Sequence, residues 1–117
     1  VGDCRMTKVG MDLVDIARFG SALNKTPKLI PRLFFESEQS LSLESKAARF
    51  AAKEALKKAV GEPETLTWNE IEVTKGGRPR IILHGETASR HADLANRIDL
   101  SISHDAGIAG AVVIIDA

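Results

Sequence analysis

Two acidic residues, Asp12 and Glu54, interrupt stretches of this sequence that are otherwise apolar or basic. Asp12 lies within "KVGMDLV" (Lys8–Val14), which alternates like a short strand, and Glu54 lies within "RFAAKEALKKAVG" (Arg49–Gly61), which has the spacing of a helix. A strand carboxylate and a helix carboxylate can converge on one hard cation. Mg²⁺ commonly takes one or two carboxylates and fills its remaining positions with waters and substrate phosphates.

Basic residues close to Glu54 extend this hypothesis to a polyanionic substrate, because Arg49, Lys53 and Lys58 follow one another along the same predicted helix. Each acid alone also has an ordinary interpretation. Glu54 and Lys58 are spaced i, i+4, and such a surface pair contributes only about 0.3–0.5 kcal/mol. Asp12 fits a solvated position on an edge strand or a cap. The residues alone leave both interpretations open.

The sequence gives little support for a zinc site, a glycine-rich phosphate loop or a serine nucleophile. The three histidines, His84, His91 and His104, lack metal-ligand spacing, and Cys4 is the single cysteine, so no zinc set is predicted. The sequence contains no G-x-x-x-x-G-K-[ST] or G-x-G-x-x-G phosphate loop and no G-x-S-x-G elbow.

Length and composition predict one small globular domain. The chain has 117 residues, and we expect a domain over residues 8–117 with residues 1–7 as a disordered extension or a remnant of expression. The 16 basic residues balance the 16 acidic ones, so the whole-chain charge gives no reason to expect a nucleic-acid or membrane partner. One thiol and no long apolar run favour the cytoplasm.

The elements that must position these residues follow from periodicity and caps. In the strand over 8–14, Val9, Met11 and Leu13 share one face, which we expect to be the inner one, with Asp12 pointing away. Asp15 is expected to cap a helix, a short bent helix should follow Thr26, and Ser37 is expected to cap another.

The helix predicted over 45–60 has an alanine stripe and a second face formed by Arg49, Lys53 and Lys57. Beyond it the pattern predicts strands over 67–74 and 78–85 joined at Gly76-Gly77, a helix over 86–97, and strands over 98–103 and 108–116. This order predicts an α+β fold with helices packed on a mainly antiparallel sheet.

The motifs resemble those of a known family. "VGMDLVDIARF" is similar to the opening G-[ILV]-D motif of the holo-acyl-carrier-protein synthases, which are small phosphopantetheinyl transferases. "ARFAAKEALKKAVG" resembles their W/F-A-x-K-E-A-x-x-K-A signature, and "WNEIEV", "GRPRIILHG" and "SISHD" with "AGAVVII" follow in the family's order. The resemblance covers nearly everything from Lys8 to Asp116.

The resemblance implies the family's fold and a Mg²⁺-dependent transfer of 4′-phosphopantetheine from coenzyme A to a serine of an apo acyl carrier protein, which releases adenosine 3′,5′-bisphosphate. Asp12 and Glu54 match the metal ligands, and Glu54 and Lys58 match catalytic positions. The matching coenzyme A positions are Arg49, Lys53, Lys58 and His104. A basic patch for the acidic carrier protein is expected at Arg18, Lys25, Lys28 and Arg32. Small members of the family are usually homotrimers that bind coenzyme A across each subunit boundary.

Two rival functions remain at this point. One is a different Mg²⁺-dependent phosphoryl-transfer enzyme that uses the same acid pair, and the other is a non-catalytic α+β assembly module. Departures from the family pattern concern Pro31 in the second helix, Asp105 after His104, and a short segment between Phe35 and Arg49.

Overall fold

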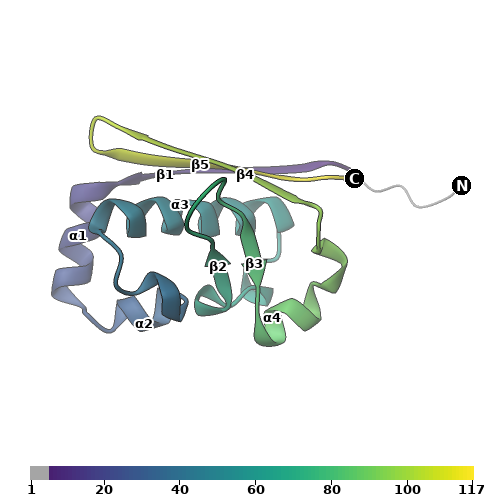
Figure 1. The fold of residues 1–117 in the computed structure, drawn as a ribbon, viewed down its shortest axis with the longest axis horizontal. Coiled ribbons are helices and arrows are strands. Elements are labelled where there is room, and N and C mark those ends of the chain that lie inside the picture. Colours follow the sequence, from purple (N-terminus) through teal and green to yellow (C-terminus); the bar gives the residue numbers. More distant parts are fainter. Residues whose placement is uncertain (1–5) are drawn as a thin grey trace, which may run out of the picture.

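The computed structural model describes residues 6–117, so most of the extension expected at residues 1–7 lies outside the described part of the chain. A three-stranded antiparallel sheet of order β1-β5-β4 lies along one side of the long helix α3, and a two-stranded hairpin, β2-β3, lies on the other side with α4 (Figure 1). The predicted α+β class is confirmed. The elements are β1 (Lys8–Asp15), α1 (Ile16–Lys25), α2 (Leu29–Leu33), α3 (Leu43–Val60), β2 (Ile71–Val73), β3 (Ile81–Leu83), α4 (Gly85–Arg90), β4 (Ile98–Asp105) and β5 (Ile108–Ile115), with 3-10 turns at Glu36–Glu38, Pro63–Thr65, Trp68–Glu70 and Ala92–Leu94.

Small residues let α3 approach the sheet closely. The Ser42 side chain accepts a hydrogen bond from the Ser45 amide and caps the start of α3, and Gly61 ends it with φ of 84°. A Cβ atom on Gly10 of β1 would lie 2.8 Å from the Ala59 backbone nitrogen and closer still to the Ala55 carbonyl oxygen. Glycine at position 10 and alanines on α3 are therefore what allow strand and helix to touch backbone to backbone.

The second face predicted for α3 is buried instead of being a solvated basic surface. Arg49 is 9% exposed, Lys53 0% and Lys57 8%. The Lys57 ammonium donates to the carbonyl oxygens of Pro63 (3.1 Å) and Leu66 (2.6 Å) and lies 4.0 Å from the centre of the Trp68 ring. Periodicity showed that these three residues share a face of α3. It could not show that segments between residues 33 and 74 cover this face and present carbonyl oxygens to it.

The side of β1 that faces inward is the opposite of the predicted one. Gly10 and Val14 face α3, whereas Val9, Met11 and Leu13 are 65%, 55% and 62% exposed. Alternation identifies which residues share a face but not which face is buried. Because Gly10 has no side chain, the sequence did not mark its side of the strand as the buried one. The outer apolar face continues onto β5, where Ile108, Val112 and Ile114 are also exposed.

Several boundaries differ from the predicted ones. The helix expected over 86–97 ends at Arg90 and gives way to a 3-10 turn and then to Asn96 at φ of 64°. The 3-10 turn at 36–38 is capped from Phe35, two residues before the expected Ser37 cap. The last strand pair is longer than predicted, because Ala106 and Gly107 both adopt positive φ and form a tight turn directly after Asp105. Over residues 6–117, no helix combines the length and apolar character needed to cross a bilayer.

Candidate active site

Asp12 and Glu54 lie in one cleft, where β1 passes alongside α3. Asp12 follows Gly10 on the inner side of the strand, so the close strand–helix contact brings its carboxylate to the helix. The cleft has a volume of about 470 Å³ and is also lined by Lys58, Arg18 and Phe50, among others. The structure therefore places both acids in the lining of one cleft.

Burial and mutual repulsion disfavour the charged form of Glu54. Removal of water around the side chain raises the pKa of Glu54, the Asp12 charge raises it further, and Lys58 and Lys57 oppose the shift. Two carboxylates held together at this cost form a donor set that attracts a hard cation. No group of three or more potential ligands occurs within residues 6–117, so a bound Mg²⁺ would take its other oxygens from water and substrate. The residues present thus fit such an ion.

Lys58 crosses to the strand instead of pairing with Glu54 along the helix. Its ammonium lies 3.0 Å from Asp12 Oδ1 and donates to the Met11 carbonyl oxygen at 3.0 Å. The side chain is 55% exposed, so the ammonium remains accessible to a ligand in the cleft. The simple i, i+4 surface pair considered from the sequence is therefore wrong.

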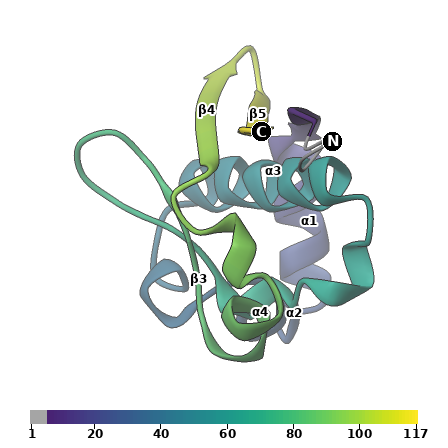
Figure 2. The same ribbon diagram turned by 90° about the vertical axis from the view of Figure 1, so that its right-hand side faces the viewer.

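A second cleft, of about 280 Å³, contains Arg49 and His104. It lies between the start of α3, the end of β4 and the loop between β2 and β3, which extends away from the body of the molecule (Figure 2). Lys75 also lines this cleft, although the sequence analysis did not select it. The signal that could have identified Lys75 is its position next to Gly76-Gly77, since basic residues beside glycines in a hairpin loop are well placed to meet phosphate.

The two clefts open at opposite edges of the same sheet. Asp12 lies on edge strand β1 and His104 on edge strand β4, with β5 between them (Figure 2). The residues predicted to bind coenzyme A are accordingly divided, because Lys58 lines the first cleft whereas Arg49 and His104 line the second. One protomer does not present them as a single continuous surface.

Lys53 lies in neither cleft, which corrects its predicted contact with coenzyme A. Its ammonium is fully buried, 2.5 Å from Glu38 Oε1, and donates to the carbonyl oxygens of Leu33 (2.8 Å) and Trp68 (3.2 Å). Burial lowers the pKa of Lys53, although the Glu38 charge opposes this effect. With its donors already occupied by protein oxygens, Lys53 has none to offer a phosphate.

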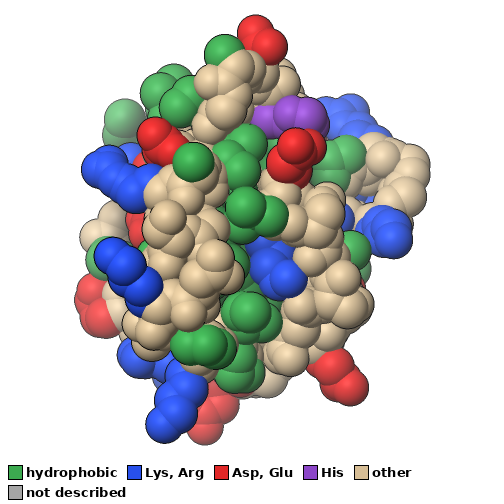
Figure 3. All heavy atoms as spheres, turned by 90° about the vertical axis from the view of Figure 1, so that its left-hand side faces the viewer, with side chains coloured by type: hydrophobic (Ala, Val, Ile, Leu, Met, Phe, Trp, Pro, Cys, Tyr) green, Lys and Arg blue, Asp and Glu red, His purple; other side chains and the backbone are tan. Residues whose placement is uncertain are grey.

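The residues predicted to dock a carrier protein are all exposed, on α1, on α2 and, for Lys28, in the turn between these helices. Arg18 lines the first cleft, and Lys25, Lys28 and Arg32 extend the positive charge away from it. Figure 3 faces the end of the molecule where α1 lies and shows basic side chains on both sides of a central band of hydrophobic side chains. Pro31 lies within α2, which is only five residues long.

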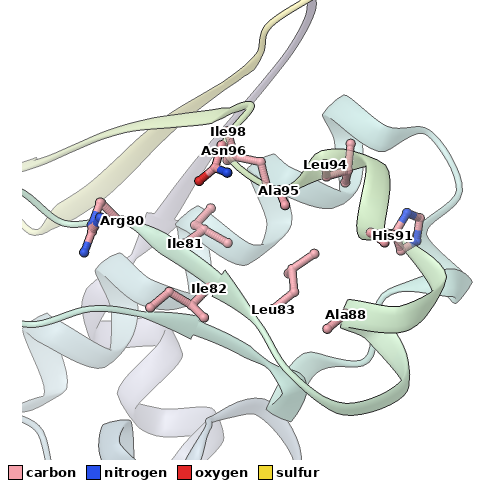
Figure 4. A pocket seen from close by; sticks show the side chains of 11 residues that line it. Arg80, Ile81, Ile82, Leu83, Ala88, His91, Leu94, Ala95, Asn96 and Ile98 are labelled. Atoms are coloured by element: carbon pink, nitrogen blue, oxygen red, sulfur yellow. The ribbon is translucent and has the colours of Figure 1, made fainter.

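A third pocket, of about 310 Å³, involves none of the predicted site residues. Ile81 and Leu83 of β3 line it together with Ala88 and Leu94 from α4 and the following 3-10 turn (Figure 4). Its lining is mainly aliphatic, and it carries no acidic side chain. We therefore do not assign it to the reaction.

Known proteins resemble this chain over most of its length. The model of the 4′-phosphopantetheinyl transferase superfamily matches residues 8–109. The holo-[acyl-carrier-protein] synthase of Streptomyces coelicolor is 51% identical over 115 residues, which cover 91% of this chain and 94% of that protein. The corresponding synthase of Clavibacter michiganensis is 48% identical over 109 residues, with 91% and 92% coverage.

Solved structures show the same fold with a ligand. An ACPS–CoA complex from Chronobacterium ammoniagenes superposes with a TM-score of 0.81 at 31% identity and covers 96% of this chain and 98% of its own. The Helicobacter pylori holo-[acyl-carrier-protein] synthase in complex with coenzyme A has a TM-score of 0.78 at 32% identity, with 92% and 99% coverage. This chain therefore belongs to the 4′-phosphopantetheinyl transferase superfamily, within its holo-[acyl-carrier-protein] synthase branch.

Proposed function

We propose that this protein transfers 4′-phosphopantetheine from coenzyme A to a serine of an apo acyl carrier protein. The observation that carries the proposal is the cleft in which Asp12, Glu54 and Lys58 meet. Relatives of nearly the same length are named for this activity, and two structural neighbours were solved with coenzyme A. One thiol in the chain and coenzyme A as substrate favour the cytoplasm as the place of reaction.

The reaction breaks the phosphoanhydride bond of coenzyme A and forms a phosphodiester with the serine. The serine oxygen attacks the pantetheine-side phosphorus, the bond from that phosphorus to the bridging oxygen breaks, and adenosine 3′,5′-bisphosphate leaves with the electron pair. A Mg²⁺ held by Asp12 and Glu54 would supply stabilisation of the charge that develops on the bridging oxygen.

The side chains of the first cleft have separate roles in this proposal. Lys58 is exposed enough to exchange its contact with Asp12 for a phosphate oxygen, and there it acts as a point charge. The Glu54 carboxylate lies in the same cleft, where it can accept the proton that the serine loses. Arg49 and His104 bind the phosphates and nucleotide portion of coenzyme A in the second cleft.

Homotrimer formation would join the two kinds of cleft. A coenzyme A molecule that contacts both Lys58 and His104 must span opposite edges of one sheet or pass from one protomer to the next. The exposed apolar side chains of β1 and β5, among them Met11 and Val112, supply a face for self-association. We propose that protomers pack through this face, so that the β1 edge of one lies against the β4 edge of its neighbour.

Sedimentation velocity tests this assembly. Met11→Asp should shift the protein toward monomer and remove activity, since a charge would enter a buried interface. Ile82→Asp is the matched control, because Ile82 is a similarly exposed apolar residue, 39% against 55%, on the other sheet. Equal sedimentation of the Met11→Asp variant and wild type would contradict this interface.

The activity itself is tested by intact mass spectrometry of an apo acyl carrier protein incubated with the enzyme, coenzyme A and Mg²⁺. The proposal predicts that the carrier becomes heavier by one phosphopantetheine, that adenosine 3′,5′-bisphosphate appears in equal amount, and that a chelator stops both. A different phosphoryl transfer would yield another product. An unchanged carrier mass, with neither coenzyme A binding nor thermal stabilisation by Mg²⁺, would instead indicate a non-catalytic module.

A further inference from the structure

Glu38 is the one buried carboxylate within residues 6–117, with an exposed fraction of 1%. It accepts hydrogen bonds from the backbone amides of Phe35 (2.9 Å) and Val73 (2.8 Å) and from the Lys53 ammonium (2.5 Å). Its Oε2 atom lies 4.0 Å from Arg49 Nε. The carboxylate therefore connects the short turn before α3, strand β2, and two consecutive turns of α3.

Arg49 has fewer hydrogen bonds than a buried guanidinium normally makes. Nη1 donates to the Ser45 carbonyl oxygen and Nη2 to the Thr74 carbonyl oxygen, both at 3.3 Å, which is long for such a bond. A guanidinium has five N–H donors, and Nε is buried without a partner among the residues that the structure describes. The unused donors belong to a group that lines the second cleft.

Glu38 compensates Arg49 less completely than it compensates Lys53. Its carboxylate contacts the Lys53 ammonium directly, and the charge of Glu72 also acts on Lys53, whereas Arg49 Nε lies 4.0 Å from Glu38 Oε2. Loss of hydration lowers the pKa values of both cations, and the charge of Glu38 opposes this effect in each. A phosphate in the second cleft, which Glu44 also lines, would pair with the Arg49 charge and accept hydrogen bonds from the N–H groups that its Nη atoms leave unused.

We propose that Glu38 is a positioning residue for phosphopantetheine transfer, in that its buried carboxylate holds the Arg49 guanidinium against the second cleft so that it can donate to a phosphate of coenzyme A. The inference rests on the proposed function, since it takes Arg49 to contact coenzyme A. Lys53 holds Glu38 in place, because its ammonium binds the Glu38 carboxylate and also the carbonyl oxygens of Leu33 and Trp68. This lysine therefore has a role within the fold.

A double-mutant cycle on binding of adenosine 3′,5′-bisphosphate, the product of the proposed reaction, tests the inference. Wild type, Glu38→Gln, Arg49→Met and the combined variant are compared by calorimetry after thermal unfolding has shown each to be folded. We expect Glu38→Gln to raise the Kd about tenfold in the wild-type background, because the charge-assisted contact through Arg49 loses its alignment. In the Arg49→Met background the same change should alter the Kd less than about twofold.

Glu72→Gln is the matched control. The charge of Glu72 also acts on Lys53, but its carboxylate contacts Ser37 and His84 and does not reach Arg49. The Kd should stay within about twofold of wild type. In steady-state kinetics, Glu38→Gln should raise the KM for coenzyme A and leave kcat and the KM for carrier protein nearly unchanged. A purely structural role would lower the active fraction and hence kcat alone.

The outcomes separate the inference from the function on which it rests. If Arg49→Met weakens binding and Glu38→Gln does not, the positioning role is refuted and the binding role of Arg49 stands. If Arg49→Met leaves the Kd unchanged, the assignment of Arg49 to coenzyme A fails and the inference fails with it. Equal, additive effects of the two changes would also refute it. If Glu38→Gln prevents folding, the double variant Lys53→Met/Glu38→Gln is compared with the single variant Lys53→Met. Both of these proteins lack the buried lysine charge, so only the Glu38 charge differs between them.

Discussion

Gly10→Ala tests the close contact that brings Asp12 to α3. The new methyl group would lie 2.8 Å from the Ala59 backbone nitrogen and nearer still to the Ala55 carbonyl oxygen, whereas ordinary contact begins at 3.4 Å. Both atoms belong to a helix backbone that cannot rotate away, so β1 must withdraw from α3. Overpacking of this kind typically costs 1–3 kcal/mol, and the backbone contact places this case at about 3 kcal/mol.

The assay is thermal unfolding at one fixed protein concentration, since assembly makes Tm depend on concentration. With a shift of about 4 °C per kcal/mol for a chain of this size, Gly10→Ala should lower Tm by about 12 °C. Asp12 lies two residues further along the displaced strand, so the variant should also lose most of the stabilisation that Mg²⁺ gives the wild type.

Gly61→Ala provides the matched control at the end of the same helix. A Cβ atom there meets nothing within 4 Å, and only the positive φ of 84° is unfavourable, which should cost about 1 kcal/mol, or about 4 °C. It should leave the Mg²⁺ effect intact. The structural reasoning would be refuted by a Gly10→Ala protein that unfolds within about 1 °C of wild type and retains its response to Mg²⁺.

Three further predictions follow from the charges in the first cleft. Burial and the Asp12 charge raise the pKa of Glu54, so its ionisation costs stability as pH rises from the ordinary value of 4.5 through the higher folded value. Without divalent metal, Glu54→Gln should therefore raise Tm at pH 7 and raise it less near pH 4. A Tm below that of wild type at pH 7 would contradict this reasoning. Lys58→Met should tighten Mn²⁺ binding in the absence of coenzyme A by about two- to fivefold, because the Lys58 ammonium competes with the metal for Asp12. Electron paramagnetic resonance measures this binding, and weaker binding would show that Lys58 helps to build the site. Arg18→Glu should raise the KM for carrier protein about tenfold and leave the KM for coenzyme A alone, whereas the opposite pattern would remove Arg18 from the docking surface.

The sequence predicted most of the elements and singled out the two acids, Asp12 and Glu54, because these depend on local signals. Asp15 caps α1 as expected, with its carboxylate accepting from the Arg18 amide at 3.0 Å, and Gly61 ends α3. The hairpin and the last strand pair were also predicted, since glycines mark the turns between their strands. Asp12 and Glu54 could be selected because acids are uncommon in the apolar and basic stretches that hold them.

Predictions failed where the answer depended on long-range packing. The inner side of β1 could not be known without the contact between Gly10 and α3, and the reversal turned Met11 from an expected core residue into an exposed one. Arg49, Lys53 and Lys57 were expected on one basic face, because nothing local shows that carbonyl oxygens and Glu38 cover them. The sequence pattern did not single out Glu38, because its partners lie 3, 11, 15 and 35 residues away.

The most direct test of an active site shared between protomers is to mix two impaired proteins. Glu54→Gln inactivates the first cleft, and Arg49→Met impairs the second. Co-expression of the two variants with different affinity tags yields assemblies that carry both kinds of protomer. Transfer is measured at limiting coenzyme A by the mass of the carrier protein. With random assembly, about a quarter of the interfaces combine two intact halves, and the mixed protein should recover about a quarter of wild-type activity. Mixed assemblies no more active than the average of the two parent variants would contradict a site divided between neighbouring protomers.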